Sequence, residues 1–297
     1  MKFSLIIPVA PGRNAEILES IKDLDFSKKQ FEVIVKPGKN ASENRNNGSR
    51  EARGEFLVFL DDDAFIDKNY LNNLNEFLRK NQNVEIIGGP QLTPEEDKFF
   101  AKISGIALSS WFGGFKVNQR YESKKEKIGV NETAVTSANL VVKKSSFEKI
   151  GGFNLDLFPG EDSEFIQRAI KKGFKVAYSP KIVIYHKRRP SYNLFVKQML
   201  KYGFTRAKVS RILRETRIIF LIPMFFSLYV IFLPILYLIS FIFISPLIAY
   251  VLLCLIFSGI DSKKARNIAG FFLLPILYFT IHFSYGIGMV AGHLKRN

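Results

Sequence analysis

The sequence predicts an α/β domain followed by helices that enter a membrane. Over residues 1–205, short runs of β-branched and aromatic residues alternate with amphipathic segments, which indicates a mostly parallel sheet covered by helices. The pattern then changes, because residues 218–260 contain no Asp, Glu, Lys or Arg. Core helices of a soluble protein do not need so long a charge-free run, so we favour a membrane region.

Six strands are predicted from nearly continuous apolar runs. They lie at residues 3–9, 31–36, 56–61, 84–89, 139–143 and 175–178. A helix at residues 15–24 places Ile17, Ile21 and Leu24 on one face. Ligands bind at the carboxyl ends of the strands in such sheets, so functional residues are expected there.

Two further helices are predicted from capping signals. Asp67 is expected to cap the helix that follows it. That helix carries an apolar stripe of Leu71, Leu74 and Leu78. The tetrapeptide Ser145-Ser146-Phe147-Glu148 has the spacing of a capping box, which predicts the start of another helix.

The C-terminal third contains two uncharged runs. As one helix, residues 218–260 would measure roughly 65 Å, whereas the hydrocarbon core is about 30 Å thick, so two crossings fit better. A bend is expected near residues 238–240 or at residues 245–246. The second run, residues 268–294, is also long enough to span, although His282 and several glycines make it less apolar.

Basic residues flank the first uncharged run and indicate its orientation. Lys263, Lys264 and Arg266 follow it, and five arginines and lysines precede it between residues 206 and 217. By the positive-inside rule both flanks are cytosolic, which agrees with an even number of crossings between them. A third crossing would place the C-terminus outside, against the basic pair Lys295-Arg296, so an interfacial or re-entrant third segment is the alternative.

These observations predict three parts. Residues 1–205 form the α/β domain, residues 206–217 a basic juxtamembrane segment, and residues 218–294 the membrane region, with segments at about 218–238, 240–260 and 268–292. The apolar N-terminus is too short for a signal peptide, so we expect the first domain in the cytosol. Cys254 is the single cysteine and allows no disulfide within the chain, so nothing requires an oxidising compartment.

The formal net charge of +16 restricts the classes of partner. Such an excess fits nucleic acid, an anionic membrane surface or phosphate-bearing substrates. A nucleic-acid binder should carry its cations on a soluble face interleaved with aromatic residues. Many cations here flank the uncharged runs instead, so the membrane and phosphate-bearing substrates are favoured, and no nucleic-acid partner is expected.

An acidic triplet, Asp61-Asp62-Asp63, directly follows the apolar run at residues 56–60. Three adjacent carboxylates repel one another, and a divalent cation bound to a diphosphate would offset that repulsion. Mg²⁺ or Mn²⁺ needs only one or two protein carboxylates when phosphates supply further ligands. The alternative is a solvated acidic turn before a helix.

A second acidic motif, Gly160-Glu161-Asp162, precedes a predicted helix at residues 163–172. A carboxylate there could remove a proton from a substrate hydroxyl. Acidic residues are also common at helix N-termini, where they favour the helix dipole, so simple capping is the alternative.

A third, basic motif contains His186, Arg188 and Arg189. His186 could ligate a metal or contact phosphate, and the arginines could neutralise a departing diphosphate. A structural histidine and arginines that contact lipid headgroups are the alternatives. A helix is expected at residues 193–202, along the membrane or across the mouth of the site.

In their order along the chain, these motifs resemble the family-2 inverting glycosyltransferases with the GT-A fold. The resemblance covers nearly all of residues 1–205. Phe3-Ser4-Leu5-Ile6-Ile7-Pro8-Val9 resembles the first strand and nucleotide-facing loop, and the segment Asn44-Arg45-Asn46-Asn47-Gly48 resembles the helix that leads to the metal-binding strand. Leu60-Asp61-Asp62-Asp63 resembles the DXD motif. The resemblance implies a Rossmann-like domain that binds a nucleotide-sugar with Mg²⁺ or Mn²⁺.

The resemblance also implies roles for individual residues. Asp61 would face the nucleoside sugar with Asp62 beside it, Asp63 would bind the metal, and Asp162 would be the catalytic base beside Glu161. The donor would also contact Pro8, Val9, Asn40 and Arg45; His186 would complete the metal site; and Asn139, Arg188, Arg189 and Gln198 would lie on the diphosphate or acceptor side.

Two departures from the family pattern limit the comparison. The segment after the second strand, residues 35–40, lacks the carboxylate that often contacts the base, so Asn40, Arg45 or backbone groups would serve, with a UDP-sugar as the family default. Gln198-Met199-Leu200-Lys201-Tyr202 matches the Gln-x-x-Arg-Trp motif only loosely, so processive polymer synthesis is not implied. The C-terminal runs suit the subgroup similar to succinoglycan-type exopolysaccharide transferases, which act on lipid-linked or glycan acceptors.

Three functions are therefore compared. The leading one is transfer to a hydroxyl of a lipid-linked or polysaccharide acceptor, by a multi-pass protein of the cell (inner or plasma) membrane with a cytosolic catalytic domain. Transfer to a polyprenyl phosphate is the second, and it needs no general base because that acceptor is already ionised. A non-catalytic membrane scaffold is the third, and it would not need the carboxylates Asp61–Asp63.

Overall fold

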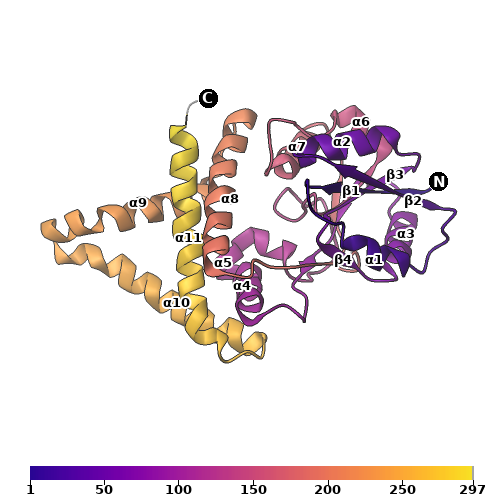
Figure 1. Ribbon diagram of the computed structural model, residues 1–297. Helices are drawn as coiled ribbons and strands as arrows, with labels where there is room; N and C mark the ends of the chain where they lie inside the picture. The colour runs from indigo at the N-terminus through magenta and orange to yellow at the C-terminus, as the bar shows by residue number, and fades with distance from the viewer. Residues whose placement is uncertain (296–297) are drawn as a thin grey trace. The chain divides into compact units, whose positions relative to one another are not determined.

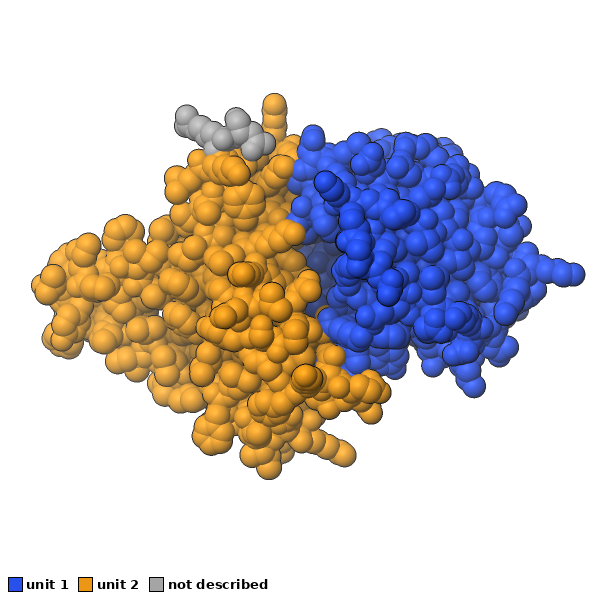
Figure 2. Space-filling view, in the orientation of Figure 1, with its two compact units in different colours: residues 1–94, 119–187 blue, residues 95–118, 188–297 orange. Residues whose placement is uncertain are grey.

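The computed structural model describes residues 1–295 and forms two compact units, coloured separately in Figure 2. Unit 1 comprises Met1–Pro94 and Gln119–Lys187, and unit 2 comprises Glu95–Asn118 and Arg188–Asn297. These units do not coincide with the predicted limits at residues 205 and 217, which remain a prediction about domains. Arg296, half of the predicted basic pair, lies outside the described residues.

Unit 1 is built on a seven-stranded sheet with the order β2-β1-β3-β8-β5-β9-β7. Its strands are β1 (Phe3–Val9), β2 (Phe31–Pro37), β3 (Phe56–Leu60), β5 (Ile86–Gly88), β7 (Lys127–Ile128), β8 (Asn139–Lys143) and β9 (Val176–Tyr178). β1 pairs in parallel with β2 and β3, and β5 with β9, whereas β8 is antiparallel to both β3 and β5. The α/β fold is confirmed, and the central sheet is mixed where β8 enters it.

Helices cover both faces of this sheet, as Figure 1 shows. They are α1 (Ile17–Lys22), α2 (Ala41–Glu51), α3 (Tyr70–Lys80), α6 (Lys144–Ile150) and α7 (Glu161–Lys171). Alternate residues of β1 separate the two cores: Leu5 and Ile7 pack with α1 and α3, whereas Ile6 packs with α6 and α7. Successive side chains of a strand are therefore buried under the helices on opposite faces of the sheet. Burial on both faces explains the continuous apolar runs.

Two predicted helix starts are wrong. α3 begins at Tyr70, because Asp67 closes the preceding turn by accepting hydrogen bonds from the backbone N–H groups of Asn69 and Tyr70. The capping box at residues 145–148 is absent, since β8 ends at Lys143 and α6 starts at Lys144. Ser145 thus already lies in the first helical turn.

A small second sheet carries part of the site, and its strands are interspersed along the chain with those of the large sheet. It has the order β4-β10-β6, with β4 (Ala64–Ile66), β6 (Gln91–Leu92) and β10 (Ile184–His186). β4 and β10 are antiparallel, and His186 is the register partner of Ala64. The register therefore brings His186 next to the end of the acidic triplet.

Unit 2 consists of helices. They are α4 (Phe99–Ser109), α5 (Trp111–Gly114), α8 (Tyr192–Leu213), α9 (Ile218–Ile239), η2 (Phe241–Ile244), α10 (Ser245–Lys264) and α11 (Gly270–Leu294), while η1 (Phe115–Arg120) joins the units. The bend in the first uncharged run is η2, which occupies the interval between the two predicted positions. Three stretches, containing α9, η2 with α10, and α11, are long and apolar enough to cross a membrane.

Candidate active site

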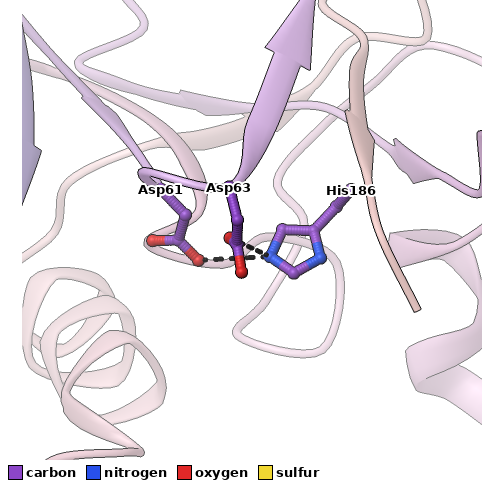
Figure 3. A group of neighbouring side chains, drawn as sticks. All are labelled: Asp61, Asp63 and His186. Carbon is purple, nitrogen blue, oxygen red and sulfur yellow. Dashed lines mark ion pairs between the residues drawn. The ribbon is translucent and has the colours of Figure 1, made fainter. Parts of the chain in front are cut away.

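Asp61, Asp63 and His186 form a cluster of candidate metal ligands (Figure 3). The two aspartates leave the end of the buried strand β3, and His186 ends β10. The His186 Nε2 atom lies 3.1 Å from Asp63 Oδ1 and 3.6 Å from Asp61 Oδ2. One ligand atom from each residue can be chosen so that all lie within 4.8 Å of one another. Two carboxylates and an imidazole form a donor set that suits Mn²⁺ and, through the oxygens, Mg²⁺.

The electrostatics of this cluster reflect mutual stabilisation of opposite charges. Burial alone would lower the pKa of His186, but hydrogen bonds to Asp61 and Asp63 and their charges raise it to about 9. Burial likewise opposes ionisation of Asp63, yet the contacts with His186 and Arg13 hold its pKa well below the usual value. In the absence of a metal, the protonated imidazole therefore supplies the positive charge that the carboxylates require.

Arg45 connects this cluster to the second acidic motif. Its guanidinium donates from Nη2 to Asp61 Oδ1 at 2.7 Å and from Nη1 to Glu161 Oε1 at 2.9 Å. The side chains of Arg45 and Glu161 are each only 3% exposed. Ser137 Oγ also donates to Glu161 Oε1, at 2.9 Å. The buried polar face of α2 is explained by this link, since α2 carries Arg45 into the site.

Glu161 is a buried carboxyl group that is incompletely paired. Burial raises its pKa to about 7, with Arg45 opposing the shift and Asp162 adding to it. Its Oε2 atom and the Nε atom of Arg45 have no hydrogen-bond partner among residues 1–295. Glu161 therefore changes protonation near neutral pH inside a polar network.

Asp162 is more accessible than its neighbour. It is half-buried in the first turn of α7, where its Oδ1 atom accepts a hydrogen bond from the backbone N–H of Ser163 at 2.6 Å. Gly160, with φ of 107°, adopts the left-handed conformation that starts this turn. The N-terminal position stabilises a carboxylate and leaves part of it open to solvent.

Arg13 belongs to this group of residues, although no sequence motif indicated it. Its Nη2 atom lies 2.8 Å from Asp63 Oδ2 and its Nε atom 3.4 Å from Asp62 Oδ2. Asp62 is 5% exposed, and burial raises its pKa despite the opposing charge of Arg13. The sequence itself offered only a basic residue in the loop after β1.

Several residues predicted to contact the donor or acceptor have structural partners. Pro8 and Val9 are buried in β1. Asn40 caps α2, because its side chain accepts from the backbone N–H groups of Ser42 and Glu43. Asn139 is fully buried: it accepts from the Tyr70 hydroxyl and donates to the carbonyl oxygen of Ile182 at 2.8 Å. These contacts explain the positions of the residues, and their substrate roles remain predictions.

Three further predicted site residues belong to unit 2. Arg188 is buried, and its backbone N–H donates to Asp97 Oδ2 at 2.9 Å. Arg189 is exposed. Gln198 donates to the Tyr202 hydroxyl at 2.9 Å within α8, which is longer than the predicted helix. Their roles on the diphosphate or acceptor side also remain predictions.

Comparison with known proteins identifies the family of this chain. Residues 56–281 match the sequence profile of glycosyl transferase family group 2. The chain belongs to this family. The matched segment includes the acidic triplet, the Glu161-Asp162 motif and His186, so the residues that make up the cluster lie within the family region of this glycosyltransferase.

Two curated relatives are also glycosyltransferases. One is the dolichyl N-acetyl-alpha-D-glucosaminyl phosphate 3-beta-D-2,3-diacetamido-2,3-dideoxy-beta-D-glucuronosyltransferase of Methanococcus voltae, 24% identical over 99% of this chain and 98% of the relative. The other is the O-antigen chain rhamnosyltransferase WbaN of Salmonella anatum, 27% identical over 52% of this chain and 48% of the relative.

A solved structure extends the similarity of this glycosyltransferase to the whole fold. It is the mannosyltransferase PcManGT of Pyrobaculum calidifontis in complex with GDP-Man and Mn²⁺. The TM-score is 0.59 at 14% identity, and the alignment covers 99% of this chain and 87% of the other. The GT-A fold expected from the sequence is thereby confirmed.

Proposed function

We propose that this glycosyltransferase moves a sugar from a nucleoside-diphosphate donor to a hydroxyl of a lipid-linked or polysaccharide acceptor. The proposal rests mainly on the cluster of Asp61, Asp63 and His186 at the carboxyl end of β3. That edge of a parallel strand pair is where α/β folds bind ligands, and the cluster is the donor set that a metal-bound diphosphate requires.

Asp63 and His186 would hold the metal, with Asp61 as a third ligand or a contact to the nucleoside sugar. A bound Mg²⁺ or Mn²⁺ would supply charge stabilisation to the departing diphosphate. Arg13 would exchange its carboxylate partners for a phosphate oxygen when the donor enters. Arg45 orients Asp61 through the 2.7 Å hydrogen bond and is itself held by Glu161.

Asp162 is the proposed general base. An acceptor hydroxyl is a poor nucleophile until a nearby group takes its proton, and the half-buried Asp162 carboxylate is accessible for that step. Glu161 is adjacent but buried against Arg45, so it serves as a positioning residue that fixes the guanidinium.

We infer the substrates and the location from the family, from a curated relative and from the apolar stretches. The donor is a nucleotide-sugar, with a UDP-sugar as the family default. The name of the Methanococcus voltae relative specifies an N-acetylglucosaminyl phosphate carried on dolichol, which supports a lipid-linked acceptor. The three apolar stretches support a multi-pass protein of the cell membrane that uses cytosolic donors, with the α9–α10 hairpin crossing twice.

Donor turnover by the purified full-length protein tests this function. Hydrolysis and binding of common nucleotide-sugars would be screened with Mg²⁺ and with Mn²⁺. Asp63→Asn should abolish transfer and weaken metal-dependent donor binding, because it removes a charged ligand that faces the diphosphate. Asp67→Asn is the matched control, since Asp67 is exposed and lies outside the cluster. Near-normal turnover by folded Asp63→Asn protein would overturn the assignment.

A further inference from the structure

The ends of the apolar helices reveal how unit 2 meets a bilayer. α9 and α10 are joined by η2 and flanked by charged residues at their outer ends, so a hairpin that crosses twice has both outer ends on one side. α11 begins shortly after α10 ends. At its other end, the carbonyl oxygen of Lys295 accepts a 2.7 Å hydrogen bond from Arg211 Nη1, and Arg211 lies just before α9. Both ends of α11 are therefore tied to the same side.

α8 accompanies α11 along most of its length. The Tyr192 hydroxyl and Thr280 Oγ1 lie 3.0 Å apart near the start of the pair. Further along, the backbones touch: a Cβ at Gly203 would lie 1.9 Å from the carbonyl oxygen of Tyr285. Neither lipid nor water separates helices at that distance, so α8 and α11 share one environment.

The charges of α8 determine that environment. The helix carries five cations, Lys197, Lys201, Arg206, Lys208 and Arg211. A lysine or arginine at the centre of a membrane helix costs about 2.5–3.5 kcal/mol even on the most lenient scale. A pair that carries five of them is stable at a headgroup surface and unstable in hydrocarbon, and α11 must remain with α8.

α11 is more deeply buried in the protein than the other two apolar stretches. Within the most apolar 18-residue window, 50% of α11 is buried by protein, against 6% for α9 and 11% for the stretch of η2 and α10. Figure 1 shows α8 and α11 side by side, with α9 and α10 extending from them and meeting at η2. Among residues 1–295, the α9–α10 hairpin is the apolar part that leaves nearly all of its side chains outside the protein core, as contact with lipid requires.

The middle of α11 contacts the short helix α5 on one side and α10 on the other, where the Tyr250 hydroxyl lies 2.8 Å from His282 Nδ1. His282 Nε2 lies 3.0 Å from the carbonyl oxygen of Phe112 in the four-residue helix α5. If α11 spanned the bilayer, α5 and the exposed Trp111 would lie near the bilayer centre. A four-residue helix leaves most of its backbone groups without partners inside the helix, which is unfavourable in hydrocarbon.

We propose that α8 and α11 form an interfacial pair that lies on one leaflet, and that only α9 and α10 cross the membrane. The partner of the α8–α11 pair is the anionic headgroup layer of that leaflet. Lys197 and Lys201 are exposed on α8, and Lys263 and Arg266 line a pocket at the α10–α11 turn. Ile268 in the same pocket is 84% exposed and would enter the leaflet beside the cations. The inference does not depend on the proposed catalytic activity.

Sided cysteine labelling of the full-length chain tests the topology. In a Cys254→Ala background, exposed positions would be substituted one at a time: Thr216→Cys, Phe241→Cys, Ala265→Cys and His293→Cys. An impermeant maleimide should label positions 216, 265 and 293 from one side and position 241 from the other. Labelling of position 293 from the side of position 241 would show that α11 spans, and would overturn the proposal.

The single tryptophan, Trp111, gives an independent measure of depth in the unmodified protein. In vesicles that contain anionic lipid, bromines near the headgroups should quench its fluorescence more strongly than bromines near the chain ends, because α5 follows the interfacial pair. Stronger quenching by the deep bromines would place α5 and the middle of α11 in hydrocarbon. Absence of quenching by either would remove the contact with the leaflet. Either result overturns the proposal.

Discussion

His186 Nε2 lies 3.1 Å from Asp63 Oδ1 because His186 and Ala64 are register partners in the β4–β10 pair. Asp63 immediately precedes Ala64, so the strand pairing places the imidazole and the carboxylate on neighbouring positions. A shift of the register by one residue would turn the imidazole to the opposite face of the small sheet. The geometry of the candidate metal cluster thus depends on backbone pairing as well as on the three side chains.

Metal binding should release a proton from His186. The imidazole has a pKa of about 9 in this cluster and must be neutral to act as a ligand. Mn²⁺ affinity should therefore rise between pH 7 and pH 9, approaching about tenfold for each pH unit. Calorimetry in buffers of different ionisation enthalpy counts the protons. His186→Gln should lose this dependence, and the control His293→Gln should keep it; a pH-independent affinity in the parent protein would contradict the assignment.

Removal of Arg13 should strengthen metal binding in the absence of donor. Arg13 contacts Asp62 and Asp63, so it competes with a cation for the same carboxylates. Arg13 is half exposed, and exposed ion pairs contribute about 0.2–1 kcal/mol, so Arg13→Gln should raise Mn²⁺ affinity by roughly 1.4- to 5-fold. Arg53→Gln is the control, because Arg53 pairs with Glu32 instead. Weaker Mn²⁺ binding by Arg13→Gln would exclude this competition.

Loss of the proposed base should affect turnover and leave the donor site intact. Asp162→Asn keeps the size of the side chain and can still cap α7, but it no longer accepts the proton. Transfer should fall by about 10²–10⁴-fold with donor and metal affinity little changed. If Asp162 only caps the helix, turnover should stay within about threefold of the parent rate. That result would exclude Asp162 as the base and favour a phosphate acceptor, which needs none.

Glu161 should make the protein less stable as the pH rises. The folded chain keeps a proton on Glu161 up to a pKa of about 7, whereas the unfolded chain releases it near 4.5. Stability contributed by this group is therefore present below pH 4.5 and lost as the pH rises to about 7. The loss is on the order of 3 kcal/mol. Thermal unfolding in detergent at both ends of this window measures it. Glu161→Gln should flatten the pH dependence, and an unchanged slope would contradict the assignment.

The sequence predicted the elements of the sheet more reliably than their directions. Buried strands such as β3 and β8 have similar apolar composition whichever way they run, so the antiparallel entry of β8 left no trace in the pattern. The capping prediction at Asp67 failed because an aspartate closes a turn through the same local hydrogen bonds that cap a helix.

The candidate site shows the same division between local and long-range information. Asp61 and Asp63 were predicted because they follow an apolar strand in the sequence itself. The bridge from Arg45 to Asp61 and Glu161 depends on the packing of α2 against the sheet, and spacing along the chain does not encode it. Arg13 was missed for a similar reason, since a single arginine in a loop after a strand is in most proteins a solvated surface residue.

In the proposed topology, the tip of the α9–α10 hairpin is the part of the chain that reaches the far leaflet. Residues 240–245 contain no charged side chain, and the Ser240 hydroxyl is already paired with the backbone N–H of Ile242. Each charge moved across a membrane couples to the transmembrane potential by about 2.3 kcal/mol per 100 mV. With no charged side chain to carry across, insertion of the hairpin in this topology would not couple its side chains to the membrane potential. Such insertion would proceed by partitioning of the apolar side chains, in an energised or a de-energised membrane alike.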